Sequence, residues 1–285
     1  MSLWLQPGLY FLDYGPMQMA ISASCGKRPL RREILEAAEY AKDLLAELAA
    51  CLNVAKLPIE EIKHSPASPA VLAMMIDAVK RCADPSLTPM AAVAGSIADR
   101  VADFLFERGA TKAIVNNGGD IALRLAEGES AKVGIKSDLN SRAVSHIIEV
   151  DCAARLGGIA TSGLGGRSFT KGIASAAVAL GMNCRLADAA VTLVANHTFS
   201  PDPEIKLIRA EALDPDTDLQ GHLVTAAVGR LKPETWRQAL ANGLAKAREF
   251  VEQGTICGAV IFAGGLMAAV PEGLFDRILQ VNNNN

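Results

Sequence analysis

One short motif constrains the fold of this chain more than any other feature. An apolar run at 113–115 leads into Asn-Asn-Gly-Gly-Asp at 116–120, and a second apolar run follows at 121–123. Paired glycines permit positive φ angles and carry no Cβ, so the pattern predicts two strands, a tight turn and room for a ligand against the main chain. The residues that would line this ligand site are Asn117, Gly118, Gly119 and Asp120. A simple hairpin turn without a ligand is the alternative.

Composition and charge narrow the class of protein. The chain has 285 residues, 50% of them hydrophobic and 21% charged, which predicts a well-packed globular protein with one large or two small domains. The net charge of −3 and the scattered basic residues argue against DNA or RNA as partners. Apolar segments are interrupted before the roughly 20 residues that a membrane span needs. No basic region precedes the apolar residues of 1–14, so we expect no secretory signal and a cytoplasmic location.

Helical periodicity occurs in five stretches. Apolar residues recur every three or four positions, with charged residues between them, in segments 31–52, 70–82, 90–108, 186–196 and 233–253. The segment 90–108 is rich in alanine and glycine on one side, so we expect it to pack very closely against a neighbour. It directly precedes the Gly-Gly-Asp turn.

Strand patterns surround a glycine-rich segment. Residues 131–136 and 145–150 alternate partly between apolar and polar side chains, which is typical of antiparallel strands, and 257–265 predicts a buried strand with a glycine turn. Between them, residues 157–168 contain five glycines, three hydroxyl residues and one arginine, and we expect a loop there. Its exposed backbone N–H groups, with Thr161, Ser162, Gly163 and Arg167, are suited to hold a phosphate or pyrophosphate. A flexible surface loop is the alternative.

An acid and a hydroxyl share one face of the predicted helix at 186–196. Asp188 and Thr192 are four residues apart, so both oxygens point the same way. Such a pair could hold a Mg²⁺ ion that keeps several waters and bridges to a substrate phosphate. Alternatively, Asp188 is only an acidic residue favoured by the dipole at the start of its own helix.

The six cysteines show no Cys-x-x-Cys spacing, which argues against a zinc knuckle or a redox dithiol. We expect reduced and mostly buried thiols. Cys25 is the exception, because Lys27 and Arg28 follow it and nearby cations favour a reactive thiolate.

Taken together, the small-residue helix, Asn-Gly-Gly-Asp, Ala-Thr-Ser-Gly and Ala-Asp-Ala-x-x-Thr resemble the ApbE-like superfamily, whose best-known members are FAD:protein FMN transferases. The match covers roughly residues 88–196. Thr-Pro-Met-Ala-Ala-Val-Ala-Gly at 88–95 and Tyr-Gly-Pro-Met at 14–17 look more closely like one branch of that superfamily, found in bacteria and archaea.

The resemblance implies an α+β fold related to the T-fold, with an antiparallel or mixed sheet packed with helices and duplicated subdomains. We expect a single domain over 1–285, with its motif-bearing core at about 88–196. The resemblance also implies a site for FAD or FMN, with a divalent metal on Asp188 and Thr192 and the Gly-Gly-Asp turn along the nucleotide. Homo-oligomers are common among T-fold relatives.

Two positions differ from the flavin transferases. Ala94 stands where those enzymes carry Lys, and residues 168–172 replace their His-Ile-x-Asp-Pro-x-Thr-Gly segment. The leading hypothesis is an enzyme that binds a flavin nucleotide or another phosphorylated small molecule with Mg²⁺ and moves a phosphoryl-linked group, with Asp188 and Arg167 as its catalytic residues. The alternative is a non-catalytic ligand-binding protein or an accessory protein of sulfur or homocysteine metabolism, in which Cys25 carries sulfur.

Overall fold

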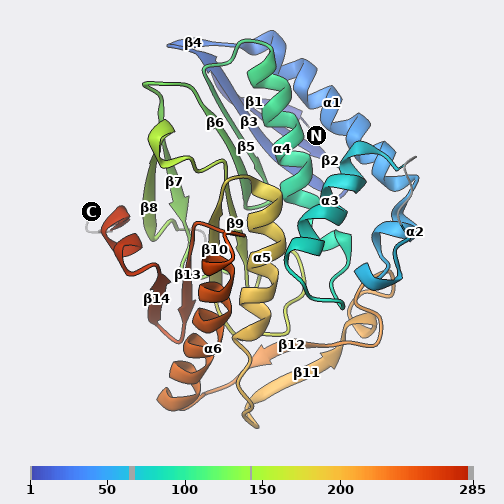
Figure 1. Ribbon diagram of the computed structural model, residues 1–285, viewed down its shortest axis with the longest axis vertical. Coiled ribbons are helices and arrows are strands. Elements are labelled where there is room, and N and C mark those ends of the chain that lie inside the picture. Colours follow the sequence, from blue (N-terminus) through green and yellow to red (C-terminus); the bar gives the residue numbers. More distant parts are fainter. Residues whose placement is uncertain (1, 64–67, 142, 282–285) are drawn as a thin grey trace. The chain divides into compact units, whose positions relative to one another are not determined.

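The computed structural model describes residues 2–63, 68–141 and 143–281, and the chain divides into two compact units (Figure 1). Unit 1 consists of Met1–Ala131, Val150–Ala160 and Gly181–Ala189, and unit 2 of Lys132–Glu149, Thr161–Leu180 and Ala190–Asn285. Each unit contains antiparallel strands and helices, so the predicted α+β class with an antiparallel sheet is confirmed. No helix in the described part of the chain has the length and apolar character that crossing a membrane requires.

The sheet of unit 1 follows the order β1-β2-β3-β5-β6-β9, with β4 paired to the far end of β3. Its strands are β1 (Ser2–Gln6), β2 (Leu9–Tyr14), β3 (Met17–Cys25), β4 (Arg28–Pro29), β5 (Lys112–Asn117), β6 (Asp120–Leu125) and β9 (Gly158–Ser162). In β3, every second residue from Met17 to Ala23 is buried. One face of this sheet is therefore a continuous apolar surface for helices.

Helices α1 and α4 of unit 1 pack on that surface, and its other helices pack against them. They are α1 (Arg31–Ala49), α2 (Leu52–Ala55), α3 (Ala70–Arg81) and α4 (Val93–Glu107), with short 3₁₀ turns η1 (Ile59–Glu61) and η2 (Pro89–Ala92). Helix α4 lies against β5 and β6, and α1 lies against α4 and β3. The rings of Tyr40 on α1 and Phe104 on α4 stack with centroids 4.8 Å apart. The predicted helix at 90–108 thus forms, but its first turn is 3₁₀ rather than α.

Unit 2 contains three small strand groups. Their order is β10-β13-β14, β11-β12 and β15-β8-β7. The strands are β7 (Ser130–Ile135), β8 (His146–Asp151), β10 (Ala176–Gly181), β11 (Ile205–Arg209), β12 (Leu223–Val228), β13 (Gly258–Ala263), β14 (Leu266–Val270) and β15 (Ile278–Gln280). The shorter 3₁₀ segments are η3 (Cys152–Ala154), η4 (Ala210–Ala212) and η5 (Glu272–Arg277).

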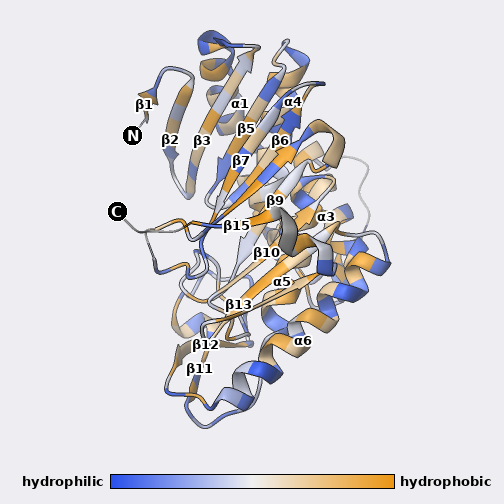
Figure 2. Ribbon diagram, turned by 90° about the vertical axis from the view of Figure 1, so that its left-hand side faces the viewer, coloured by the Kyte–Doolittle hydropathy of each residue, from blue (hydrophilic) through white to orange (hydrophobic). Residues whose placement is uncertain are grey.

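Two long helices complete the fold. Helix α6 (Pro233–Glu252) packs on β13 and β14, and all six residues of β13 are buried. Figure 2 shows the apolar colouring of β13 and the alternation of polar and apolar residues along α6. Helix α5 (Cys184–His197) contains the boundary between the units, which falls after Ala189.

The glycine-rich segment is only partly a loop. Residues Gly158–Ser162 form strand β9, which pairs with β6, so the prediction of a loop throughout 157–168 is wrong for these positions. Ile159 and Ala160 are buried in the sheet. A Cβ at Gly158 would lie 2.2 Å from the backbone N of Cys184, so this glycine serves close packing rather than loop flexibility.

Candidate functional site

Asp188 of α5 caps the start of a different helix. Its Oδ2 accepts a hydrogen bond of 2.8 Å from the backbone N of Gly95, and the backbone of Ala94 donates to the same carboxylate. These N–H groups belong to the first turn of α4, where the helix dipole favours a negative charge. Asp188 thus has a structural role at a helix start, as the alternative expected, although the helix it serves through these bonds is α4 rather than only its own.

The Gly-Gly-Asp turn lies beside the same helix start. Asn117 at the end of β5 donates from Nδ2 to the carbonyl of Ala94 over 3.2 Å. In the hairpin, Asn117 stands opposite Asp120, and the connecting Gly118 and Gly119 have φ angles of 72° and 118°. The predicted strand, turn and strand are thus present, and only glycine adopts such angles without strain.

Asp120 is close enough to act on the Asp188 carboxylate through its charge. Burial and the negative charge of Asp120 raise the pKa of Asp188 well above its ordinary value, while the backbone hydrogen bonds from Gly95 and Ala94 act in the opposite direction. We call these two acids, beside the first turn of α4, the two-carboxylate site. It joins three elements that are distant in sequence: α4, the β5–β6 turn and α5.

Five predicted site residues belong to unit 2. Thr161 and Ser162 are half-buried at the end of β9, and Arg167 is exposed in the turn that follows. Gly163 is buried, and a Cβ added to it would lie about 3.0 Å from backbone atoms of Ala174 and Ala176. Thr192 is half-buried one turn after Asp188 along α5. Their grouping with the two-carboxylate site stays a prediction.

The segment that differs from the flavin transferases is well ordered in unit 2. The backbone N of Lys171 donates to Asn196 Oδ1 over 2.8 Å, and its carbonyl accepts from Thr225 Oγ1 over 3.1 Å. The Nζ of Lys171 lies 3.3 Å from Nδ1 of His222. The side chain of Lys171 therefore lies beside His222, which precedes β12, a contact that the sequence did not suggest.

Asp99 is a further polar residue that the sequence analysis missed. Its side chain is completely buried on α4, and its carboxylate accepts from the backbone N of Cys184 at 3.1 Å and of Arg185 at 3.0 Å. These are the first N–H groups of α5. Asn183 caps the same helix start, because its Oδ1 accepts from the N of Leu186 over 3.0 Å.

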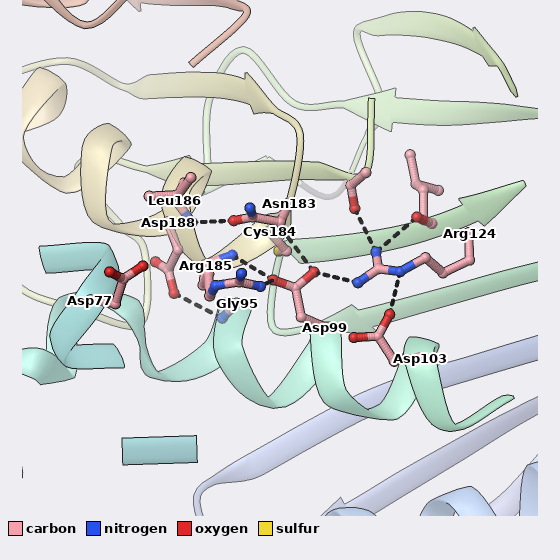
Figure 3. A network of polar contacts seen from close by, with 12 residues as sticks. Asp77, Gly95, Asp99, Asp103, Arg124, Asn183, Cys184, Arg185, Leu186 and Asp188 are labelled. Atoms are coloured by element: carbon pink, nitrogen blue, oxygen red, sulfur yellow. Dashed lines mark hydrogen bonds and ion pairs between the residues drawn. The ribbon is translucent and has the colours of Figure 1, made fainter. Parts of the chain in front are cut away.

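Two arginines surround the Asp99 carboxylate (Figure 3). Arg124 of β6 contacts Asp99 at 3.1 Å and Asp103 at 2.6 Å, and the side chain of Arg185 contacts Asp99 at 3.2 Å. Burial opposes the charge of Arg124, but the hydrogen bond to Asp103 and the charges of both acids raise its pKa. We call Asp99, Asp103, Arg124 and Arg185 the α5 clamp.

A signal for the clamp exists in the sequence. Asp99 stands four residues after Gly95, on the face of small residues that predicts close packing, and a charge on such a face needs partners. Arg124 likewise interrupts the apolar run of β6. The sequence does not show that Asp99 and Arg124 are partners, because they are 25 residues apart and no local pattern connects them.

The donors of the two-carboxylate site suit a particular kind of metal. Mg²⁺ prefers carboxylate oxygens and is usually held by one or two of them, together with waters and substrate phosphates. Among the residues that the structure describes, no group of three or more His, Cys, Asp or Glu side chains could hold a metal. Asp120 and Asp188 supply the one or two carboxylates that Mg²⁺ takes when substrate phosphates complete its ligands, and the metal assignment stays a prediction.

The cysteines differ from the expectation of mostly buried thiols. All six are free, but only Cys82 and Cys184 are buried, whereas Cys25 and Cys257 are exposed. Burial raises the pKa of the Cys184 thiol well above its ordinary value, so this residue packs beside the clamp as an apolar side chain. Cys25 ends β3, where the chain turns into β4.

Comparisons with known proteins agree with this architecture. A UPF0280 protein of Methanopyrus kandleri is 32% identical over 175 residues, covering 61% of this chain and 66% of that protein. A UPF0280 protein of Methanococcus aeolicus is 33% identical over 155 residues, covering 54% and 61%. The matched region thus spans less than two thirds of either relative.

The fold is similar to that of a solved transferase. The crystal structure of Pseudomonas stutzeri flavinyl transferase ApbE, apo form, matches with a TM-score of 0.54 at 13% identity, covering 94% of this chain and 96% of that one. The family model described as AbpE bacteria matches residues 3–269. Since that match takes in nearly the whole sequence and agrees with the resemblance carried by the motifs, this chain belongs to the AbpE bacteria family, an ApbE-like family.

Proposed function

We propose that this protein binds a flavin nucleotide, or another phosphorylated small molecule, together with Mg²⁺ at the two-carboxylate site. The observation that carries the proposal is the convergence of Asp120 and Asp188 beside the first turn of α4. Two neighbouring acids, one of which raises the pKa of the other, form a favourable place for a cation. Membership of an ApbE-like family and a fold similar to a flavinyl transferase support a nucleotide as the ligand.

Each residue has a distinct role in this proposal. Asp188 would hold the ion, oriented by the hydrogen bonds from Gly95 and Ala94, and Thr192 would add its hydroxyl from the next turn of α5. Asp120 would orient the ribityl or ribose hydroxyls of the nucleotide. Asn117 fixes the turn to α4. When bound, Mg²⁺ would neutralise the phosphates and act as a Lewis acid.

The proposal extends to the transfer of a phosphoryl-linked group. Arg167 and the backbone N–H groups of the turn after β9 would stabilise negative charge as it develops on a phosphate, which is the main task of a protein in such reactions. FAD would then be cleaved between its two phosphates, with FMN passed to an acceptor and AMP released.

A thermal-shift screen tests the binding proposal. FAD, FMN, ATP and ADP are each added with and without MgCl₂. A ligand that binds only the folded protein at about 100 times its Kd should raise the Tm by about 5–10 °C. The proposal expects this rise for at least one nucleotide, and only when Mg²⁺ is present. No rise with any of the four would contradict it, whereas a rise with FAD justifies an assay for release or transfer of FMN.

Substitutions at Asp188 separate its two roles. Asp188→Asn keeps an oxygen that can accept from Gly95 but removes the charge, so we expect the Mg²⁺-dependent rise to disappear with little change in the Tm of the free protein. Asp188→Ala also removes the cap of α4 and should lower the free energy of unfolding by a further ~1 kcal/mol. Asp43→Asn, on the exposed face of α1, is the charge control. A full Mg²⁺-dependent rise in Asp188→Asn would exclude Asp188 as a metal ligand.

A further inference from the structure

Helices α4 and α5 cap each other. The carboxylate of Asp188 on α5 receives the N–H groups that begin α4, and the carboxylate of Asp99 on α4 receives the N–H groups that begin α5 (Figure 3). Gly95 and Asp99 are four residues apart on α4, and Arg185 and Asp188 are three apart on α5. Both contacts therefore lie on facing sides of the two helices, one turn from each other.

The two contacts form a closed loop of bonds. It runs from Gly95 to Asp188, back one turn along α5 to Arg185, across to Asp99, and back one turn along α4 to Gly95. At Gly95 the helices are so close that a Cβ would lie 2.6 Å from the carbonyl oxygen of Cys184. Turning or sliding either helix would lengthen both carboxylate contacts together.

The Asp99 carboxylate is held by four donors. It has no exposed surface, yet it accepts two backbone hydrogen bonds and contacts the guanidinium groups of Arg124 and Arg185, whose side chains are 18% and 25% exposed. Hydrogen bonds to an ionised acceptor are roughly twice as strong as bonds between neutral groups. A buried carboxylate with this many donors fixes the start of α5 more rigidly than the Asn183 cap alone.

We propose that Asp99 is a positioning residue for the two-carboxylate site. Through the α5 clamp, it sets the position of the helical turn that carries Asp188 and hence the distance between Asp188 and Asp120. The part of this proposal that concerns Mg²⁺ rests on the proposed function. The part that concerns the geometry of Asp188 does not, because it follows from the hydrogen bonds by which Asp99 holds the first N–H groups of α5.

The matched pair of variants is Asp99→Asn and Asp103→Asn. Both remove one negative charge and one ionic contact of Arg124, but only Asp99 contacts α5. The charge of Asp99 also acts on Asp188, so Arg185→Gln, which keeps that charge and removes a contact of the α5 clamp, is measured alongside and should move the Gly95 resonance if position is the cause. The first readout is the backbone amide resonance of Gly95 in ¹⁵N-glycine-labelled protein, which reports its hydrogen bond to Asp188. The second is the affinity for Mg²⁺ in the presence of FAD, taken from the same resonance during a MgCl₂ titration.

The proposal expects the two variants to differ. In Asp99→Asn, circular dichroism should retain the native spectrum, the Gly95 resonance should move, and the affinity for Mg²⁺ should fall about 10–100-fold, as is common when groups behind a metal ligand are altered. In Asp103→Asn, the Gly95 resonance should stay in place and the affinity should change by less than about twofold.

An unchanged Gly95 resonance and affinity in Asp99→Asn would overturn the proposal, as would equal effects in the two variants. If Asp99→Asn does not fold, Arg185→Gln decides the question, because this variant removes one ionic contact of Asp99 and leaves the backbone donors in place. The Gly95 resonance should then move in the direction expected for Asp99→Asn, by a smaller amount. No movement of this resonance would overturn the proposal. If the wild-type protein does not bind Mg²⁺ with FAD, the proposed function fails, but the Gly95 resonance still decides whether Asp99 positions Asp188.

Discussion

At the scale of single residues, Gly95 sets how closely α4 and α5 approach. Replacing a helical glycine by alanine usually stabilises a protein by about 1 kcal/mol. Here the new Cβ would meet backbone atoms of Cys184 and Arg185 at 2.6–2.9 Å, and backbone cannot move aside as a flexible side chain can. We therefore expect Gly95→Ala to lower the free energy of unfolding by about 2–3 kcal/mol in urea titrations.

Gly273 provides the control for this prediction. It is exposed in η5, and a Cβ there would meet nothing within 4 Å. Gly273→Ala should change the free energy of unfolding by no more than about 0.5 kcal/mol. Equal stability of the two variants would mean that the helices separate without cost and that the close contact is unimportant.

His146 should give unit 2 a measurable pH dependence. Its ring lies 5.1 Å from the ring of Phe262, and burial lowers its pKa from the ordinary value of 6.5. As the pH falls below 6.5, His146 is protonated in the unfolded chain before it is protonated in the folded protein. The free energy of unfolding therefore decreases until the pH reaches the lower pKa of His146 in the folded protein. His146→Asn should have the lower Tm near pH 7.5, but the difference from wild type should narrow near about pH 5.5. A constant difference across this range would contradict the assignment.

At the scale of elements, periodicity predicted the helices and the strands around the Gly-Gly-Asp turn. It failed at β9, where the glycines suggested a loop but Gly158 packs against the backbone of Cys184. No pattern in the sequence near Gly158 indicates its contact with Cys184, because the two residues are distant in the chain. Strand β3 was not predicted, although Met17, Met19, Ile21 and Ala23 occupy alternate positions that the structure buries.

The candidate site was predictable only in part for a related reason. Asp120 and Asp188 stand in recognisable motifs, so the sequence suggested both. The clamp residues are single charges within apolar elements, and their partners are supplied by the fold. Asp99, Arg124 and Arg185 come from α4, β6 and α5, which is why only the structure shows that they form one network.

At the scale of the whole molecule, the six free thiols report which parts of the chain are accessible. Cys25 and Cys257 are exposed, while Cys82 and Cys184 are buried. Burial also raises the pKa of Cys257, which lowers its thiolate fraction. In a short alkylation pulse read by mass spectrometry, we expect Cys25 to react first and Cys257 next, with Cys82 and Cys184 protected until the protein unfolds. Early labelling of Cys184 would contradict the closed α4–α5 contact, and an unreactive Cys25 would remove the sulfur-carrier alternative.

The mutual capping of α4 and α5 also bears on how the protein is made. The residues that form these bonds are 85 to 93 positions apart in the chain. Contacts at such separation form only after a long loop has closed, and they slow folding compared with local contacts. A chain still on the ribosome presents Asp99, Gly95 and Asp120 long before Asp188 has been synthesised. Asp188 therefore joins Asp120 and the first turn of α4 only when α5 has emerged and docked, so the two-carboxylate site does not exist during most of translation.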